Sequence, residues 1–429
     1  MQLANHGGGI NNHPMNIHNL VSFSGLFALM VIGWAFSKNR WRMNFRCIIF
    51  GVAIQLALAG IVFHAPGSRA AFSWLNDFVV TVLSAAQAGQ RFLFGPLAEA
   101  DNTGGFVLAM QALPMIVFFA ALMGLLYYVG LMPLILRTFA CVFAKLMGTS
   151  GAESLCASSN IFVGIESVTT VRPFLAGMTR SEYCTIITAG MATVASSTLA
   201  VYVGFLHEVF DGIAGHLISA SILSAPAAIV MSKIVYPEDG KPVTLGRSVA
   251  AEIEKDSGAI EAIVSGAMAG VKLIVGICAL LIAFLGMIAL VDLALAWAGG
   301  PFGIELSLAR ILGYVFRPLM LMVGVPWADS EIAGQMVGQR LVATEIPPYL
   351  QLAKAMADGS FSHPRTAVVV AYCLCGFAHV ASLAIFVGGT VALAPNRRKD
   401  LAEVGPRALL AANLACLMTG AAAGTFFAG

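Results

Sequence analysis

The stretch SSNIFVGIESVTTVRP (residues 158–173) sets an asparagine, a glycine and Glu166 among apolar and β-branched residues. It is too apolar for a solvent loop, yet its glycine, its carboxylate and its closing Arg-Pro pair interrupt any clean membrane span. Non-helical backbone at membrane depth is tolerated only where it is packed in protein or lines a cavity. We therefore expect residues 148–178 to form a re-entrant helical hairpin.

A second interrupted stretch, residues 301–355, has the same character. It contains Gly and Pro breaks, short apolar pieces and carboxylates, among them Glu345 in LVATEIPPYL (341–350). Each interrupted stretch is followed by two apolar spans. One such segment in each half of the chain indicates a transporter built from inverted repeats, with its site between the breaks. The expected fold class is all-α and integral to the membrane, with two re-entrant hairpins in inverted repeats.

The composition also indicates a membrane protein. Of the 429 residues, 59% are hydrophobic and 11% are charged, whereas a soluble domain carries about 25% charged residues. The net charge of +2 is small, and no basic patch with interleaved aromatics suggests a nucleic-acid partner. The eight cysteines stand mainly in apolar runs without ligand-pair spacing. We interpret them as small core residues, and expect no cofactor and no metal other than a transported cation.

Eight apolar runs have the length of about 20 residues that a helix needs to cross a bilayer. They are residues 17–37, 44–64, 106–130, 183–206, 214–236, 262–298, 364–393 and 403–427. Residues 68–97 differ, because Arg, Asn, Asp and Gln recur among the apolar residues. This pattern is typical of an amphipathic helix along the membrane interface. An ordinary span with polar ends is the alternative.

The order of these segments predicts a domain organisation and an orientation. We expect a polar tail without signal-peptide features at 1–16, scaffold spans with the interfacial helix at 17–147, a first hairpin with two spans at 148–236, a loop at 237–258, a long scaffold span at 259–300, and a second hairpin with two spans at 301–429. Basic residues concentrate in three loops, around 38–46, 237–258 and 397–407. The positive-inside rule puts these loops in the cytoplasm. Both termini are then expected outside the cytoplasmic membrane.

Carboxylates in the interrupted stretches are candidate site residues. Glu345 precedes two prolines, which favour the first turn of a helix, so we expect it where the second half of its hairpin begins. Glu166 and Ser167 follow Gly164 in the same relation in the first hairpin. The alternatives are an interfacial glutamate at a helix end for Glu345 and a hairpin turn facing water for Glu166.

Other polar residues also stand inside apolar segments. His379 lies in the seventh span and shares a helical face with Ser382, so we expect it to line a cavity; a histidine satisfied by packing is the alternative. Asn160, Thr193 and Val194 offer amide and carbonyl oxygens of the kind that bind a hard cation. The sequence contains no H-E-x-x-H, G-x-S-x-G or P-loop motif. We therefore do not expect an enzyme.

Several stretches together resemble the concentrative nucleoside transporter family. They include GTSGAES (148–154), GMATVASSTLAVYVGF (190–205), LISASILSAPAAI (217–229), SKIVYPE (232–238) and CGFAHVASLAIF (375–386), in order and with family spacing. The resemblance implies a homotrimer of eight-span protomers in the lipid bilayer, each with an interfacial helix and two hairpins. It implies a symporter that couples nucleoside import to a sodium gradient, or alternatively a proton gradient, by an elevator-like movement.

The resemblance also implies roles for single residues. Thr344-Glu345-Ile346 matches a family motif Asn-Glu-Phe, in which the glutamate binds ribose hydroxyls. Phe377 matches a residue that packs on the base, and Ser382 one that faces the ribose. His379 stands in place of a ribose-binding amide. An amide has two donors and an acceptor, whereas a neutral imidazole has one of each, so this replacement bears on the substrate.

The first hairpin departs most from the family. GIES (164–167) corresponds to a motif Gly-Gln-Thr/Ser-Glu but lacks the base-reading glutamine, and the chain is one residue shorter before the Arg172-Pro173 match. Asn160 and Val163, with the carbonyls of Thr193 and Val194, match the family's cation site. Unpaired polar groups cost a few kcal/mol, enough to alter the substrate. The alternatives are the same fold carrying a non-nucleoside polar solute, or a nucleoside-binding sensor that does not transport. The preference between purine and pyrimidine stays open.

Overall fold

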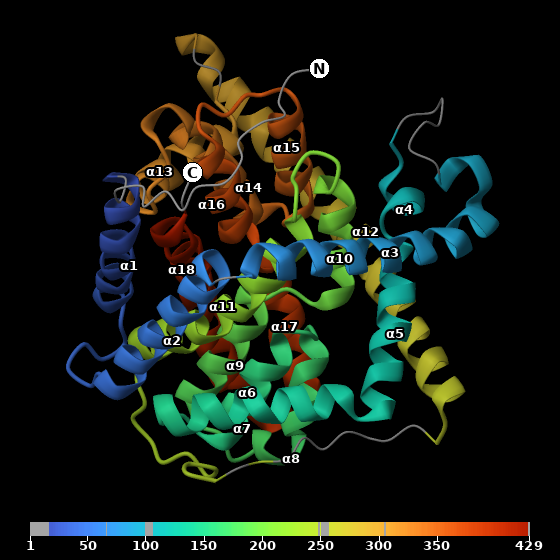
Figure 1. The fold of residues 1–429 in the computed structure, drawn as a ribbon. Helices are drawn as coiled ribbons and strands as arrows, with labels where there is room; N and C mark the ends of the chain where they lie inside the picture. Colours follow the sequence, from blue (N-terminus) through green and yellow to red (C-terminus); the bar gives the residue numbers. More distant parts are fainter. Residues whose placement is uncertain are drawn as a thin grey trace.

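The computed structural model describes residues 17–65, 67–98, 106–247, 249, 257–303 and 306–427. The expected tail 1–16 and much of the second half of the loop 237–258 lie outside these residues. Within them every named element is a helix (Figure 1). The fold class predicted from the interrupted stretches, an all-α membrane protein, is confirmed.

Two runs of the chain repeat one order of elements, namely a span, an amphipathic helix, a hairpin, a broken span and a final span. The first run is α5 (Met115–Val129), α6 (Leu131–Met147), α7 (Gly151–Asn160), the 3-10 helix η2 (Ile165–Val171) with α8 (Arg172–Leu175), α9 (Arg180–Ala192), α10 (Ser196–Leu206) and α11 (Ile213–Val235). The second is α12 (Ala259–Gly299), α13 (Leu308–Met322), α14 (Ser330–Val342), α15 (Ile346–Ala357), α16 (Pro364–Leu374), α17 (Val380–Leu393) and α18 (Arg398–Phe426).

The eight expected spans all have helical counterparts. Seven segments of the described residues are long and apolar enough to cross a membrane: Ile17–Ala35 (α1), Phe45–His64 (α2), Leu108–Val129 (α4, Leu108–Gln111, with α5), Arg180–Leu206, Ile213–Val235, Ala259–Gly299 and Pro395–Phe426. The two shorter apolar helices α16 and α17 together supply the eighth. The amphipathic helix predicted at 68–97 is α3 (Ser68–Phe94), which runs across the bundle in Figure 1.

Two of the predicted spans are not continuous helices. The span at 183–206 leaves the helical conformation between α9 and α10, where Thr193 is extended. The span at 364–393 breaks between α16 and α17, where Gly376 has a φ of 157° that side-chain-bearing residues rarely adopt. Apolar composition alone does not report such breaks, because the residues on both sides are equally hydrophobic.

Two amphipathic helices were not anticipated as separate elements. We expected α6 within the scaffold and α13 within the second hairpin, whereas the hairpin consists of α14 and α15 alone. On α13 the buried residues Gly313, Phe316 and Met320 follow helical spacing and lie on one face. Its arginines interrupt the apolar run in the sequence, which made the segment resemble part of an irregular hairpin.

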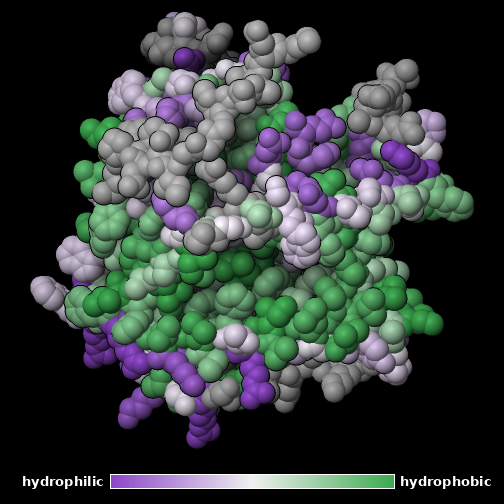
Figure 2. All heavy atoms as spheres, in the orientation of Figure 1, coloured by the Kyte–Doolittle hydropathy of each residue, from purple (hydrophilic) through white to green (hydrophobic). Residues whose placement is uncertain are grey.

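Burial is very unequal among the helices. The helices α9, α11, α16 and most of α18 are buried along nearly their whole length, whereas α12 is exposed along most of its length. On the face in Figure 2, hydrophobic residues form a broad band with hydrophilic residues gathered beyond both of its edges. This banding is the surface that a bilayer-spanning protein presents to lipid.

A seam of glycines joins α5 to α12. A Cβ atom on Gly266 would lie 2.5 Å from the carbonyl oxygen of Ala120, and one on Gly124 would lie 2.4 Å from that of Ala262. A Cβ atom on Gly270, four residues after Gly266, would lie 2.8 Å from the Cα atom of Val117. Small residues at this spacing let two membrane helices approach backbone to backbone.

The first and last spans are fastened together by one buried arginine. Arg365, at the start of α16, donates hydrogen bonds to Asn19 Oδ1 (2.5 Å), Ser22 Oγ (2.6 Å) and the carbonyls of Gly324 and Gly424 (2.9 and 2.6 Å). Asn19 Nδ2 in turn donates to the carbonyl of Phe427, at 2.9 Å. The start of α1 and the end of α18 therefore lie side by side.

Candidate substrate and cation site

The tip of the second hairpin is a strained turn. Glu345 is the N-cap residue of α15, with Pro347 and Pro348 in the first turn, as its sequence context predicted. Thr344, immediately before it, has a φ of 141°. A β-branched residue in that region costs roughly 1–3 kcal/mol, and such strain persists only where the surroundings impose it. The turn therefore fixes where the Glu345 side chain emerges.

The carboxylate of Glu345 is buried between two aromatic partners. Oε1 accepts a hydrogen bond from Tyr202 Oη on α10, at 2.7 Å. His379 Nε2 lies 3.0 Å from Oε2, but within the described residues Oε2 completes no hydrogen bond of good geometry. The Tyr202 ring stacks on Tyr349, with centroids 4.2 Å apart. One carboxylate oxygen is thus committed to the protein, and the other retains capacity for a ligand.

We expected His379 to lie inside a continuous helix. It is instead the N-cap residue of α17. Its Nδ1 accepts from the backbone N–H of Ser382, at 3.1 Å. In the neutral ring Nε2 therefore carries the proton, and that proton faces Glu345. The Ser382 hydroxyl donates to the carbonyl of His379 (2.8 Å) and contacts that of Phe377. The pair is thus a helix cap as well as part of the site.

The tip of the first hairpin meets the break between α9 and α10. Asn160 Oδ1 accepts from Ser167 Oγ at 2.8 Å, and the backbone carbonyl of Asn160 accepts from Thr193 Oγ1 at 2.7 Å. Ser221 Oγ on α11 lies 2.9 Å from the carbonyl oxygen of Ile161 and 3.4 Å from that of Val194. Side-chain and backbone oxygens from three elements therefore converge, which is the donor set that a hard cation prefers.

A cavity of about 1120 Å³ joins both hairpin tips and both helix breaks. Seven of the eleven predicted site residues line it: Val163, Ser167, Thr344, Glu345, Phe377, His379 and Ser382. Two buried hydroxyls on its wall, Thr198 Oγ1 and Thr344 Oγ1, make no hydrogen bond within the described residues. Buried polar groups without partners are costly, so the cavity is suited to a ligand that supplies hydrogen-bonding groups.

The cavity extends toward one end of the molecule. Beyond the tips it is lined by Tyr127 near the end of α5, Ala262 near the start of α12, Arg172 on α8 and Leu393 at the end of α17. The basic loop before α18 lies at this end, because Arg397 Nη1 donates to the carbonyl of Ala176 just after α8.

Three of the remaining predicted residues do not line the cavity. Asn160, Thr193 and Val194 lie behind the first hairpin tip and are buried. The side chain of Glu166 lies outside the described residues, although its backbone belongs to η2. Tyr202 and Ser221 were not singled out from the sequence, because hydroxyl-bearing residues are common in packed spans. The only indication in the sequence was that both residues lie in stretches that resemble the family, 190–205 and 217–229.

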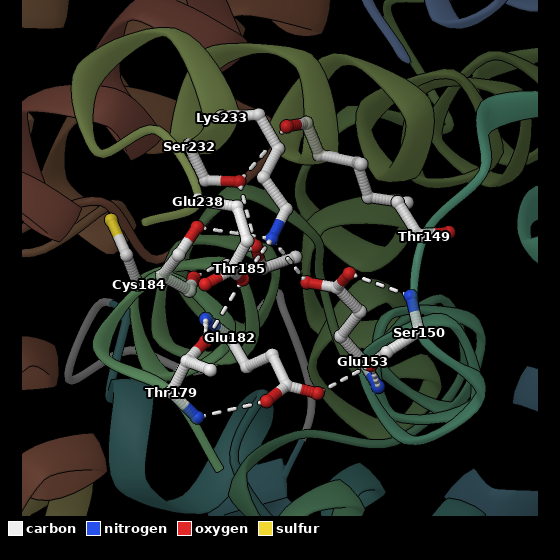
Figure 3. A network of polar contacts seen from close by, with 12 residues as sticks. Thr149, Ser150, Glu153, Thr179, Glu182, Cys184, Thr185, Ser232, Lys233 and Glu238 are labelled. Carbon is white, nitrogen blue, oxygen red and sulfur yellow. Dashed lines mark hydrogen bonds and ion pairs between the residues drawn. The ribbon is translucent and has the colours of Figure 1, made fainter. Parts of the chain in front are cut away.

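A second polar cluster braces the base of the first hairpin (Figure 3). Lys233 Nζ, buried at the end of α11, lies 2.8 Å from Glu153 Oε2 and 3.5 Å from Glu238 Oε2. Ser150 N donates to Glu153 Oε1 at 2.8 Å, and the Ser150 hydroxyl donates to Glu182 Oε1 at 2.5 Å. The cluster ties the first turns of α7 and α9 to α11.

Comparison with protein families gives one consistent result. Residues 24–97 match the model described as "Na+ dependent nucleoside transporter N-terminus", and residues 216–424 match the corresponding C-terminus model. Residues 109–208 match a model described as "Nucleoside recognition". These three ranges include both hairpins and both broken spans.

Individual relatives agree with the family models. The nucleoside permease NupC of Helicobacter pylori is 37% identical over 421 residues, which cover 96% of this chain and 99% of that protein. The mouse sodium/nucleoside cotransporter 1 is 34% identical over 95% of this chain and 64% of its own length. A solved structure of CNTnw in an inward-facing substrate-bound state superposes with a TM-score of 0.86 at 35% identity, covering 95% of this chain and 98% of that one.

Proposed function

This chain belongs to the Na+-dependent nucleoside transporter family, and from that premise we propose that it is a cation-coupled symporter that imports a nucleoside across the cytoplasmic membrane. Membership makes it a membrane transport protein and not an enzyme. The observation that carries the proposal is the cavity between the hairpin tips, where the Thr344 hydroxyl has no partner among the described residues and Glu345 Oε2, 3.0 Å from His379 Nε2, has a further lone pair for a ligand. A nucleoside offers hydroxyls for such groups and a flat base for an aromatic ring.

We assign the substrate contacts residue by residue. Glu345 accepts ribose hydroxyls through Oε2, and Thr344 provides a hydroxyl beside it. Phe377 packs against the base, while His379 and Ser382 frame the ribose from the start of α17. From the first hairpin, Glu166 and Ser167 approach the other end of the substrate. A nucleoside that makes these contacts bridges the two hairpins. A solute that lacks either the hydroxyls or the ring would not bridge them.

The glutamate gives the sharpest test. In proteoliposomes Glu345→Gln should abolish gradient-driven nucleoside uptake, because the amide presents a donor where the substrate hydroxyl needs an acceptor. A matched control is Glu331→Gln, which changes a half-exposed carboxylate at the start of α14, away from the cavity lining. Uptake by Glu345→Gln at the rate of this control would reject the assignment.

We further propose that the coupling ion is Na+, held by Asn160, Val163, Thr193 and Val194, with a proton as the alternative. The convergence of oxygens around Asn160 supports this, because the amide oxygen that now accepts from Ser167 can turn to an ion. Ion binding would then order the first hairpin tip before the substrate bridges it to the second. Removing sodium while holding the proton gradient should stop uptake, and Asn160→Ala should remove the sodium dependence. Uptake that persists without sodium and stops when the proton gradient is dissipated would identify protons instead.

The transport cycle we propose is elevator-like, in a homotrimer with cytoplasmic basic loops and external termini. Both hairpin tips and the α5–α12 pair line the same cavity, so a shift of the hairpins along that pair would carry the site across the membrane. With the basic loops inside, the cavity leads to the cytoplasm, and this conformation faces inward. The long apolar face of α12, with Ile282 and Leu293 largely exposed, offers a surface for lipid or a second protomer.

A non-nucleoside polar solute is the second candidate, and one observation favours it. His379 uses Nδ1 to cap α17 and turns Nε2 toward Glu345, so it has no third group for a ribose. Competition for uptake by uridine, adenosine and a panel of other polar solutes separates the two candidates. Thermal stabilisation by a nucleoside without any counterflow would instead indicate a sensor that does not transport.

A further inference from the structure

A second cavity, of about 540 Å³, lies between the start of α2, the length of α6 and the chain that follows α11. Four basic side chains line it, namely Arg46, Arg137, Lys145 and Arg247, and no carboxylate stands among the described residues of its lining. We refer to it as the basic cleft. The four cations come from three segments that are far apart in the sequence, so the fold gathers them into one place.

The basic cleft is partly pre-organised. Arg46 donates to the carbonyl of Lys145 through Nη2 (2.7 Å) and to that of Leu146 through Nε (3.2 Å), so it caps the end of α6. These contacts hold its guanidinium beside Lys145, and Gly148 packs against its side chain. Within the described part of the chain none of the four basic residues forms an ion pair with a carboxylate. Like charges held together in this way favour a bound anion.

The helix α6, which supplies two of the four cations, is amphipathic. The helix α6 buries Leu136 and Phe143 toward the protein, while Leu134 is 65% exposed and Leu146 is 41% exposed on the same helix as the two cations. In Figure 1, α6 runs across the lower part of the molecule, away from the end where the chain termini are labelled. A helix with this composition lies in the interface, with apolar residues among acyl chains and basic ends among headgroups. From this direction an anionic lipid headgroup can reach the cleft.

We propose that the basic cleft binds the phosphodiester headgroup of an anionic phospholipid, with the acyl chains lying against the exposed apolar residues of α6. Arginine offers two parallel N–H donors to phosphate oxygens, and lysine a point charge. Basic pockets between membrane helices at the cytoplasmic side are suited to lipids with one or two phosphates, such as phosphatidylglycerol or cardiolipin. Such a lipid would join α2, α6 and the base of the first hairpin, whichever solute the protein carries.

The test compares lipids on the purified full-length chain in detergent. Cardiolipin should raise the melting temperature and remain bound in native mass spectrometry, whereas phosphatidylethanolamine and inorganic phosphate should do neither. The variant Arg137→Gln/Lys145→Gln should bind cardiolipin about 25-fold more weakly, from roughly fivefold for each cation removed. The control Arg42→Gln/Lys399→Gln removes the same charge from exposed residues outside the cleft and should bind as the unaltered chain does.

Several results would overturn the proposal. Equal weakening in both double variants would indicate diffuse surface charge, and equal stabilisation by phosphatidylethanolamine would indicate no preference for anions. Stabilisation by inorganic phosphate alone would make the cleft a site for a free anion. If the double variant does not fold, the single variant Arg247→Gln, on the loop after α11, should still weaken cardiolipin binding about fivefold with an unchanged melting temperature without lipid.

Discussion

At the scale of single residues, the imidazole ring of His379 has two roles, one in capping a helix and one in contacting Glu345. Its Nδ1 caps the start of α17, and its Nε2–H faces the carboxylate of Glu345. An asparagine in this position would do the same with its amide oxygen and one N–H, and would keep a second N–H for a ligand. The histidine therefore preserves the architecture of the break while removing one donor from the cavity. Substrate selectivity and fold stability are separable here.

Substitution of His379 separates these roles. His379→Asn should keep the melting temperature, because asparagine is a good N-cap, whereas His379→Ala should cost about 1 kcal/mol of stability. In uptake assays His379→Asn should bind nucleosides roughly fivefold more tightly than the unaltered chain, the worth of one added hydrogen bond of about 1 kcal/mol. Should the asparagine variant be as unstable as the alanine variant, the capping role would be wrong.

Sequence reasoning found the residues whose chemistry is unusual for their surroundings. Glu345 stood out because a carboxylate in an apolar segment is costly, and the two prolines located it at a helix start. Tyr202, which donates a hydrogen bond to the same carboxylate, lies in an apolar span where a tyrosine is not unusual. The strain at Thr344 was equally invisible, because a threonine in a sequence does not disclose its φ.

At the scale of elements, the first hairpin depends on a buried charge. Lys233 compensates Glu153 and Glu238 at the base of α7 and α9, with its amine about 5% exposed. Removing one partner from a buried ion pair leaves an uncompensated charge, which costs more than the pair contributes. The helix that ends at Asn160 begins at this cluster, so the position of the cation candidates is linked to it.

The buried ion pair predicts a large effect on stability. Lys233→Met should lower the free energy of unfolding by about 3–5 kcal/mol, measured by thermal unfolding in detergent. Lys233→Met/Glu153→Gln should recover part of that loss, since the orphaned charge is removed as well. The exposed Lys354→Met on α15 serves as the control and should change little. A double variant less stable than the sum of the singles would contradict the ion-pair account.

At the scale of the whole molecule, two repeats face each other across one cavity. The two interrupted stretches predicted this symmetry from the sequence, because hairpins at membrane depth need a cavity or packing to satisfy their backbone. The broken spans and the helices α6 and α13 were not predicted as such. Hydrophobicity reports where a chain is apolar, whereas breaks depend on a few backbone angles and interface helices on which side the polar residues face.

At the glycine seam between α5 and α12, the backbones of the two halves of the chain come into close contact. Gly266→Leu should force the two helices apart, at a cost of about 1–3 kcal/mol in stability. Gly286→Leu on the same helix has open space around its Cβ and should be tolerated. Thermal unfolding and uptake of both variants check this. Equal behaviour of the two would show that the seam does not set the distance between α5 and α12.

The clasp formed by Arg365 and Asn19 has a consequence for how the chain is made. Asn19 and its partner Phe427 are separated by 408 positions. At a synthesis rate of roughly 5–20 residues per second, the ribosome needs about 20–80 s to travel between them. Throughout that time the first inserted helix waits in the membrane without its final neighbours. A chain that lacks α18 would leave the Arg365 guanidinium without the carbonyl of Gly424, so this buried cation is fully hydrogen-bonded only in the completed fold.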